Sequence, residues 1–167
     1  MRLMTYSAIA AAALSTTATA QDDGAFVTFQ VLRPELALKM AEAAMISCRE
    51  AGYQVGVTVV DRFGVPQVFL RDRFAGVHVF ETSQRKAWTA VSFRADTIDL
   101  DLTTRPETIS AGIRFISEAL PLGGGKMVIS GDGSLVGGIG ISGAPGPDLD
   151  DDCAEAGIAA IEDEIAF

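Results

Sequence analysis

The chain has 167 residues, a length that fits one domain with a sizeable core. Its 22 acidic residues outnumber 13 basic ones, and the resulting net charge of −9 argues against nucleic-acid binding through the overall field. One histidine and two cysteines, far apart in the chain, are too few in one place to form a zinc site.

The first twenty residues have the three parts of a secretory signal peptide. Arg2 is followed by an apolar stretch, residues 8–14, and then by small residues that end at Ala20. We expect cleavage after Ala20, so that residues 21–167 form a single mature domain in the periplasm or outside the cell. The apolar run is too short to span a bilayer and no later stretch reaches transmembrane length, so we expect no membrane insertion after cleavage.

The hydrophobic pattern predicts alternating helices and strands after this leader. In chain order it predicts a strand or extended arm over 25–32, a helix over 35–51, a hairpin over 54–71, a helix over 79–94, a loop with one short turn over 95–108, a short helix over 109–120, a hairpin over 126–142 and a helix over 149–166. Two hairpins imply a mainly antiparallel sheet with helices packed on it, an α/β fold of the α+β type.

Turn residues and glycines support the two hairpins. Asp61 and Gly64 suit the first turn, because Asp bonds back to the backbone and Gly accepts a positive φ. In the second hairpin, Gly137, Gly138 and Gly140 lie inside the return strand. Glycines there predict the close approach of another backbone or of a ligand.

The stretch 61–94 carries six arginine or lysine residues against three acidic ones, in a chain that is acidic as a whole. It also contains the only histidine, His78, at the start of the predicted helix. His78 has three open interpretations: a surface or capping residue, a haem-iron ligand, or a general acid–base group. Arg71, Arg85 and Lys86 are either solvated or form an anion site beside it.

Cys48 and Cys153 each lie on the apolar face of a predicted helix. If the two helices pack together, a disulfide would close a loop of about a hundred residues and stabilise the fold by up to ~4–5 kcal/mol. Two buried free thiols are the alternative. The acidic run 148–164 is interpreted as a solvated helix face, because it lacks the spacing of a calcium-binding loop.

Three segments together resemble the GlcG/HbpS-like family of haem-binding proteins: VTVVDRFG at 57–64, SQRKAWTA at 83–90 and DGSLVGGIGISGA at 132–144. The resemblance covers roughly residues 36–161. The residues that match the family pattern are Asp61, Gly64, Arg71, Lys86, Gly124, Gly137, Gly140 and Ser142. It implies a profilin-like domain with a five-stranded sheet, assembled into homo-oligomers such as octamers.

The resemblance implies a secreted protein that binds haem, with a role in haem sensing, storage or degradation. His78 is then the expected iron contact, and Arg71, Arg85 or Lys86 would hold the propionates. A second hypothesis is a small organic-acid hydratase or tautomerase, in which Lys86 or His78 donates the proton and Arg71 and Asp61 bind the carboxylate substrate. A third is a periplasmic accessory protein that partners a sensor.

Overall fold

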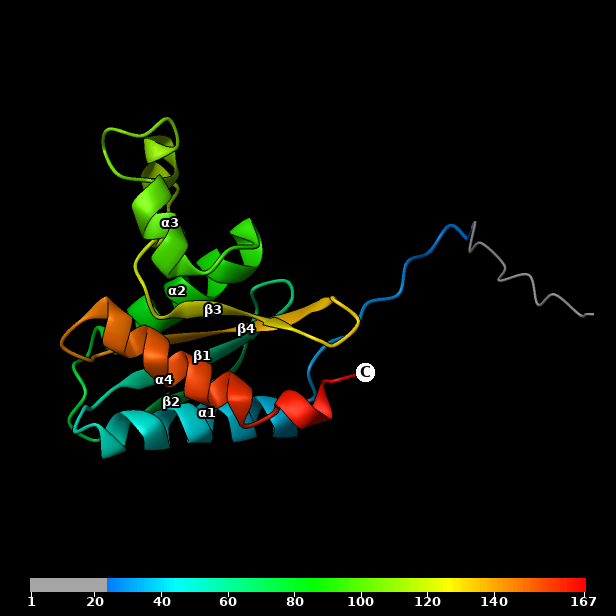
Figure 1. Cartoon of the computed structure of the whole chain (residues 1–167), viewed down its shortest axis with the longest axis horizontal. Helices are drawn as coiled ribbons and strands as arrows, with labels where there is room; N and C mark the ends of the chain where they lie inside the picture. Colours follow the sequence, from blue (N-terminus) through cyan, green and yellow to red (C-terminus); the bar gives the residue numbers. More distant parts are fainter. Residues whose placement is uncertain (1–23) are drawn as a thin grey trace, which may run out of the picture.

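A computed structural model describes residues 24–167, in which four strands form one antiparallel sheet between two layers of helices (Figure 1). The signal peptide predicted for residues 1–20 lies outside the described residues. The strand order is β2-β1-β4-β3, so the two hairpins meet through β1 and β4 at the centre. The strands are β1 (Gly56–Asp61), β2 (Pro66–Arg71), β3 (Gly125–Ile129) and β4 (Leu135–Ser142).

Helices cover both faces of this sheet. α1 and α4 pack against each other and against one face, whereas α2 packs across the other face (Figure 1). The helices are α1 (Pro34–Glu50), α2 (Val79–Phe93), α3 (Thr97–Thr103) and α4 (Pro147–Ala159), with 3-10 turns at Ala111–Phe115 and Glu162–Glu164.

The alternation of side chains along β1 explains why both faces are covered. Val57 and Val59 are buried in the core with α1. Thr58, which points to the opposite face, forms a hydrogen bond of 2.6 Å with the hydroxyl of Ser83 in α2. Every residue of β1 before Asp61 is therefore buried, as expected for a central strand between two helical layers.

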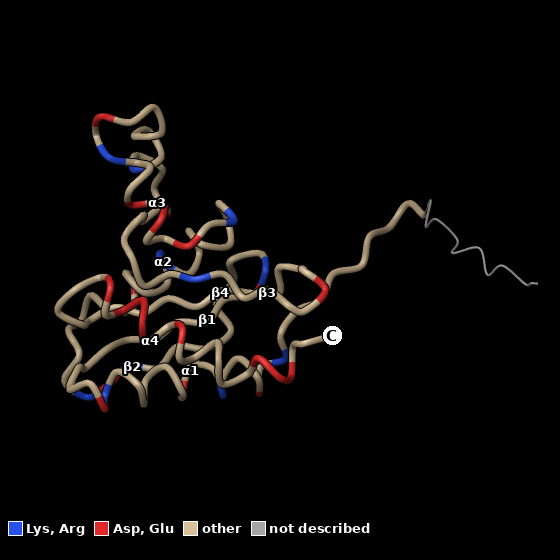
Figure 2. The backbone as a smooth tube through the Cα atoms, viewed as in Figure 1, with Lys and Arg blue, Asp and Glu red and all other residues tan. Residues whose placement is uncertain are grey.

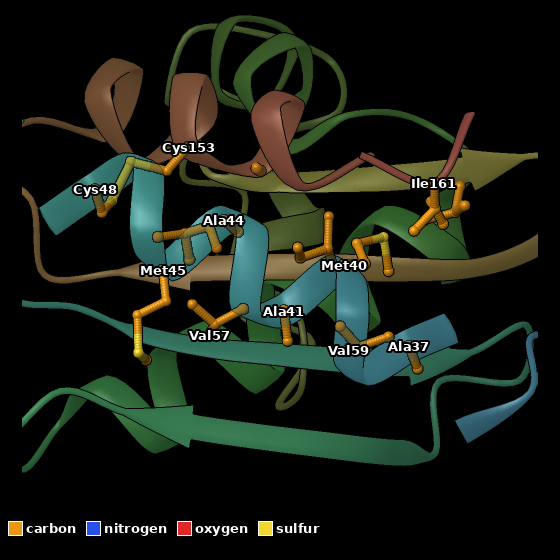
Figure 3. Close-up of a cluster of buried hydrophobic side chains, with 14 of the residues drawn as sticks. Ala37, Met40, Ala41, Ala44, Met45, Cys48, Val57, Val59, Cys153 and Ile161 are labelled. Atoms are coloured by element: carbon orange, nitrogen blue, oxygen red, sulfur yellow. A yellow bond between two sulfur atoms is a disulfide. The ribbon is translucent and has the colours of Figure 1, made fainter. Parts of the chain in front are cut away.

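The main core lies between α1, α4 and the sheet (Figure 3). The buried side chains of α1 recur every three or four residues: Ala37, Met40, Ala41, Ala44, Met45 and Cys48. The small side chain of Ala44 lets α1 lie close to α4, where a Cβ on Gly157 would come within 2.9 Å of the Ala44 Cβ. The two helices thus meet at the position where each carries a cysteine.

Cys48 of α1 and Cys153 of α4 are joined in a disulfide, with their Cα atoms 5.5 Å apart (Figure 3). Both residues are buried. Of the two alternatives that the sequence left open, the structure therefore contains the disulfide. The bond joins α1 to α4, and its two cysteines are 105 residues apart in the sequence.

The sheet has four strands, not the five expected from the family resemblance. Residues 25–32 form an extended arm that makes no strand, and Phe26 and Val27 on it are 88% and 77% exposed. The arm contacts the first hairpin through Phe29, whose ring lies 5.4 Å from that of Phe63. At its end Leu32 is buried, and the Leu32 carbonyl accepts a hydrogen bond from Gln67. Pro34 starts α1 immediately afterwards, so the chain turns onto the helical layer before it can pair with a sheet edge.

Two predicted segments between α2 and β3 differ from the structure. The loop predicted over 95–108 contains α3, because Thr97 is anchored to β3 by hydrogen bonds with the backbone of Gly125. The helix predicted over 109–120 is only a 3-10 turn, and its Phe115 is 88% exposed and so packs on nothing.

The last helix begins earlier and ends earlier than the sequence predicts. α4 starts with Pro147, after Gly146 at the cap position. Proline suits the first helical position because it needs no hydrogen-bond partner for its nitrogen. The helix ends at Ala159, and a short 3-10 turn follows.

The glycines of β4 allow α2 to lie directly on the sheet, as their positions predicted. A Cβ on Gly140 would come within 2.0 Å of the Ser83 carbonyl oxygen and 2.7 Å of the Ala87 nitrogen. We therefore expect Gly140→Ala to lower the free energy of unfolding by about 1–3 kcal/mol, as overpacking does. Urea denaturation would measure this.

Gly112→Ala is the matched control for this prediction, because a Cβ on Gly112 would meet nothing within 4 Å. We expect the control to unfold at nearly the same urea concentration as the wild type. Equal stabilities of the Gly140 and Gly112 variants would show that α2 is not held as close to β4 as the structure places it.

Candidate functional site

A pocket of about 570 Å³ opens at the end of β4, between α4, the start of α2 and the loop that precedes it. Its lining combines polar and apolar side chains, among them Tyr53, Gln54, Phe74, His78, Lys86 and Asp150. Its volume falls within the range of small-molecule and cofactor sites, about 300–1,000 Å³.

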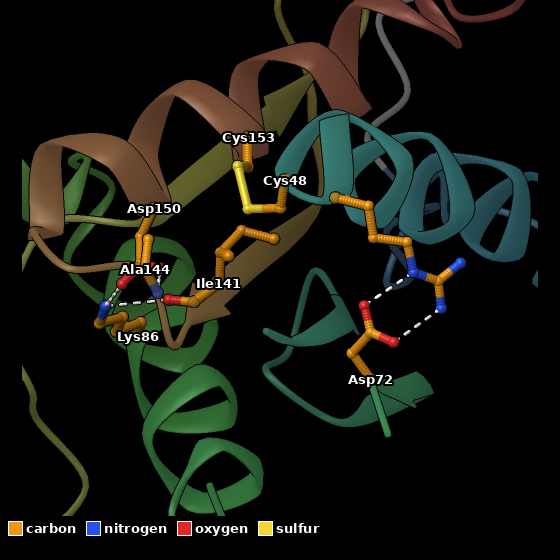
Figure 4. Close-up of a disulfide and its surroundings, with 8 residues drawn as sticks. Cys48, Asp72, Lys86, Ile141, Ala144, Asp150 and Cys153 are labelled. Carbon is orange, nitrogen blue, oxygen red and sulfur yellow. Dashed lines mark hydrogen bonds and ion pairs between the residues drawn. A yellow bond between two sulfur atoms is a disulfide. The ribbon is translucent and has the colours of Figure 1, made fainter. Parts of the chain in front are cut away.

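A buried ion pair belongs to the wall of this pocket (Figure 4). The Lys86 Nζ lies 2.8 Å from the Asp150 Oδ2, and it also donates to the Ile141 carbonyl at 2.9 Å. The second oxygen of Asp150 accepts a hydrogen bond of 3.0 Å from the Ala144 nitrogen. The side chains of Lys86 and Asp150 are only 1% and 5% exposed.

Burial determines the direction of both pKa shifts in this pair. It lowers the pKa of Lys86 below its ordinary value, and the charge of Asp150 opposes this only in part. It raises the pKa of Asp150, again with partial opposition from Lys86. Both shifts favour the neutral forms of the two groups.

Glycines of the 123–125 segment make room for the ion pair. A Cβ on Gly124 would lie 2.6 Å from the Asp150 Cβ and 3.1 Å from the Lys86 Nζ. Gly124 also has a φ of +105°, a conformation that glycine adopts readily. The triple glycine at 123–125 therefore forms the close-packed wall behind Lys86.

His78 lies at the mouth of the pocket, directly before the first residue of α2. Its backbone carbonyl accepts hydrogen bonds from the nitrogen and the hydroxyl of Thr82, while the imidazole is exposed. A Cβ on Gly76 would lie 2.6 Å from the His78 Cε1, so the glycine leaves room for the ring. Phe74, 81% exposed, lies on the same rim.

A second ion pair holds the loop that carries these rim residues (Figure 4). Arg49 of α1 donates two hydrogen bonds, of 2.7 and 3.0 Å, to the carboxylate of Asp72. The hydrogen bonds from Arg49 lower the pKa of Asp72. Arg49 directly follows Cys48 in α1, and Figure 4 shows the disulfide between this ion pair and the Lys86–Asp150 pair.

Two of the predicted site residues, His78 and Lys86, line the pocket, and three others lie elsewhere. The Arg71 guanidinium donates to the Ala75 carbonyl. Arg85 bonds Glu81 and the carbonyls of residues 118 and 119. Asp61 accepts from two backbone nitrogens in the first hairpin turn. Roles for Arg71, Arg85 and Asp61 in binding stay predictions.

The sequence analysis missed Asp150, which it placed in a solvated acidic face. Acidic residues do recur along α4 and the C-terminal turn (Figure 2), but Asp150 is buried. Its position one helical turn before the buried Cys153 was the available signal. Gln54 was also missed, and its buried Oε1 has no hydrogen-bond partner.

Two features are absent from residues 24–167, the part of the chain that the structure describes. Within them, no group of three or more His, Cys, Asp or Glu side chains is placed to hold a metal ion. None of the helices formed by these residues has the length and apolar character needed to cross a membrane.

Comparisons with known proteins point to one family. Residues 32–159 match the family model described as haem degrading protein HbpS-like. The crystal structure of HbpS superposes with a TM-score of 0.77 at 38% identity, covering 82% of this chain and 94% of that one. A crystal structure of a PduOC–heme complex superposes with a TM-score of 0.72 at 30% identity, covering 78% of this chain and 95% of that one.

The chain also resembles part of a longer enzyme. It is 32% identical to the corrinoid adenosyltransferase PduO of Citrobacter freundii over 152 residues, which are 90% of this chain but 43% of PduO. The PduO of Salmonella typhimurium is also 32% identical, over 37% of its length. The chain thus spans less than half the length of the curated relatives it matches.

Proposed function

The chain belongs to the family of HbpS-like haem-degrading proteins, and from this we propose that it binds haem in the pocket beside His78. The observation that carries the proposal is the position of His78, the one histidine of the chain, with an exposed imidazole on the pocket rim. Imidazole is a common protein ligand of haem iron. The solved PduOC–heme complex, whose protein is 30% identical to this chain, supports haem binding as such.

The residues of the pocket fit a haem group. Its volume of about 570 Å³ and its open rim accept a flat ring. Phe74 and Leu122, both on the lining, offer apolar surface for the porphyrin. No other imidazole competes for the iron, so His78 is the expected contact.

Each of these residues would contribute a separate part of the binding. His78 would bind the iron through a ring nitrogen, and Gly76 keeps the space beside that ring open. The Arg49–Asp72 pair would hold the rim loop in place while the ligand enters. Bound haem supplies an iron centre capable of redox chemistry.

We expect His78→Ala to abolish the Soret shift of the wild-type protein on haem titration, or to weaken haem affinity at least about tenfold. The reason is the loss of the iron–nitrogen bond. Arg105→Ala, which removes an exposed cation outside the pocket, is the control and should bind as the wild type does. An unchanged Soret band in the His78 variant would refute the assignment.

We also propose that the mature protein is periplasmic or secreted. The disulfide supports this, because such bonds persist in oxidising compartments and are rare in the cytosol. Intact-mass measurement of protein recovered from the periplasm should give a chain that starts at Gln21. A protein that is found only in the cytosol with Met1 retained would refute the proposal.

We propose, in addition, that copies of the chain assemble with one another. The support is the exposure of large apolar side chains at two separate places, on the arm and on the segment after α3. Phe26 is 88% exposed on the arm, and Ile109 and Phe115 are exposed on the segment. Surfaces of this kind commonly mark protein–protein contacts. Light scattering of the purified protein should give a mass above that of one chain.

A further inference from the structure

The haem contacts proposed above for His78, Phe74 and Leu122 give no role to the buried amine of Lys86. The chain has three lysines, and the other two are held in ordinary ion pairs. Lys39 pairs with Glu164 at the surface. Lys126 bridges Asp96 and Asp151 at 3.2 and 2.9 Å. Lys86 alone of the three lines the pocket beside His78.

We propose that Lys86 is a nucleophile that forms an imine with a small aldehyde or ketone in this pocket, with Asp150 transferring the protons. Three observations of the site support this. The amine and the carboxylate are 2.8 Å apart and both line the cavity. The Ala144 nitrogen and the Ile141 carbonyl hold the pair in one orientation. Gln54, on the same lining, offers a buried acceptor without a partner.

The reaction balances within this pair of residues. Asp150 takes a proton from the Lys86 ammonium, and the neutral amine attacks the carbonyl carbon to form a C–N bond. A proton then moves from the new ammonium nitrogen to the former carbonyl oxygen, which becomes the hydroxyl of a neutral carbinolamine. The C–O bond then breaks, Asp150 returns its proton to the departing hydroxyl, and water leaves. The product is a protonated imine with the Asp150 carboxylate as its counter-ion.

The direction of the pKa shifts agrees with this chemistry. Burial lowers the pKa of Lys86, which increases the fraction of neutral amine. For Lys126, burial acts in the same direction, but the hydrogen bond and charge of Asp151 together with Asp96 raise its pKa overall. Lys86 is less exposed than Lys126, yet its amine should be the more reactive of the two toward a carbonyl group.

The low exposure of Lys86 limits the class of ligand. Its side chain is 1% exposed, so a carbonyl compound can reach the Nζ only from within the pocket. A short aliphatic aldehyde or ketone suits this access, whereas a bulky aromatic aldehyde does not. The inference is independent of the haem proposal, because it requires neither iron nor His78.

The test is trapping of the imine on the haem-free full-length protein. Acetone is added with sodium cyanoborohydride at neutral pH, and the modified lysines are quantified by peptide mass mapping. We expect Lys86 to be alkylated at least about tenfold faster than Lys39 or Lys126, an advantage of about 1.4 kcal/mol in barrier. Absence of label at Lys86, or label equal to that at the surface Lys39, would overturn the proposal.

Lys86→Met provides a second readout, since its total incorporation should fall to the sum of the other two lysines. If this variant does not fold, the mapping of the wild-type protein still decides. The outcome is separable from haem binding: label at Lys86 in a protein without a Soret shift would refute the haem proposal alone. A Soret shift without label at Lys86 would refute the imine alone.

Discussion

Replacing Cys48 and Cys153 together by alanine will lower the free energy of unfolding by about 2–5 kcal/mol. The two residues are 105 positions apart, so their bond restricts most of the unfolded chain. In the chain-entropy account, a loop of about a hundred residues corresponds to about 4.7 kcal/mol. Guanidinium denaturation of the double variant beside the oxidised wild type measures the difference.

Alanine is the suitable replacement because both cysteines are buried and a serine hydroxyl would need a partner there. Reduced wild-type protein is the control, and it should lose a similar amount of stability. A loss below about 1 kcal/mol would mean that the unfolded chain is already compact around these helices, so that the bond restricts little.

Separating Lys86 from Asp150 will cost about 3–5 kcal/mol for each single replacement, because it leaves an unpaired charge in a buried position. Lys86→Met and Asp150→Asn are the two changes, and the asparagine keeps an acceptor for the Ala144 nitrogen. We expect the double variant to be less destabilised than the sum of the singles, with an interaction free energy of about 1–3 kcal/mol. Urea denaturation of all four proteins gives this cycle.

The pair of Lys39 and Glu164 is the matched control for this cycle. Its side chains are 51% and 45% exposed, so Lys39→Met should change stability by less than about 1 kcal/mol. Strict additivity of the Lys86 and Asp150 variants would show that the two groups do not interact. The structure would then misplace α4 relative to α2.

The disulfide lies next to both ion pairs of the site, so its redox state should affect the geometry of the pocket. Cys153 follows Asp150 by one turn of α4, and Cys48 precedes Arg49, which holds Asp72 (Figure 4). The bond therefore fixes both helices that position the walls of the site. A loss of stability in the cysteine variant should be accompanied by weaker ligand binding for this reason.

Local patterns in the sequence determined most of the secondary structure. Alternating valines on either side of Thr58 and the Asp61–Gly64 turn predict the first hairpin, because side-chain alternation and turn chemistry depend on neighbouring residues alone. The glycines of β4 likewise predicted a close approach, which proved to be that of α2. The family resemblance gave the α+β fold correctly, apart from a fifth strand.

Tertiary structure alone decided which polar residues share the site. Lys86 and Asp150 are 64 positions apart, and their contact depends on how α2 and α4 pack on opposite faces of the sheet. No local pattern distinguishes Asp150 from the solvated acids around it, because its burial results from the packing of α4 against β4 and α1. Tertiary structure also separates the residues predicted in 61–94: Arg71 and Arg85 bond nearby carbonyls, whereas His78 and Lys86 line the pocket.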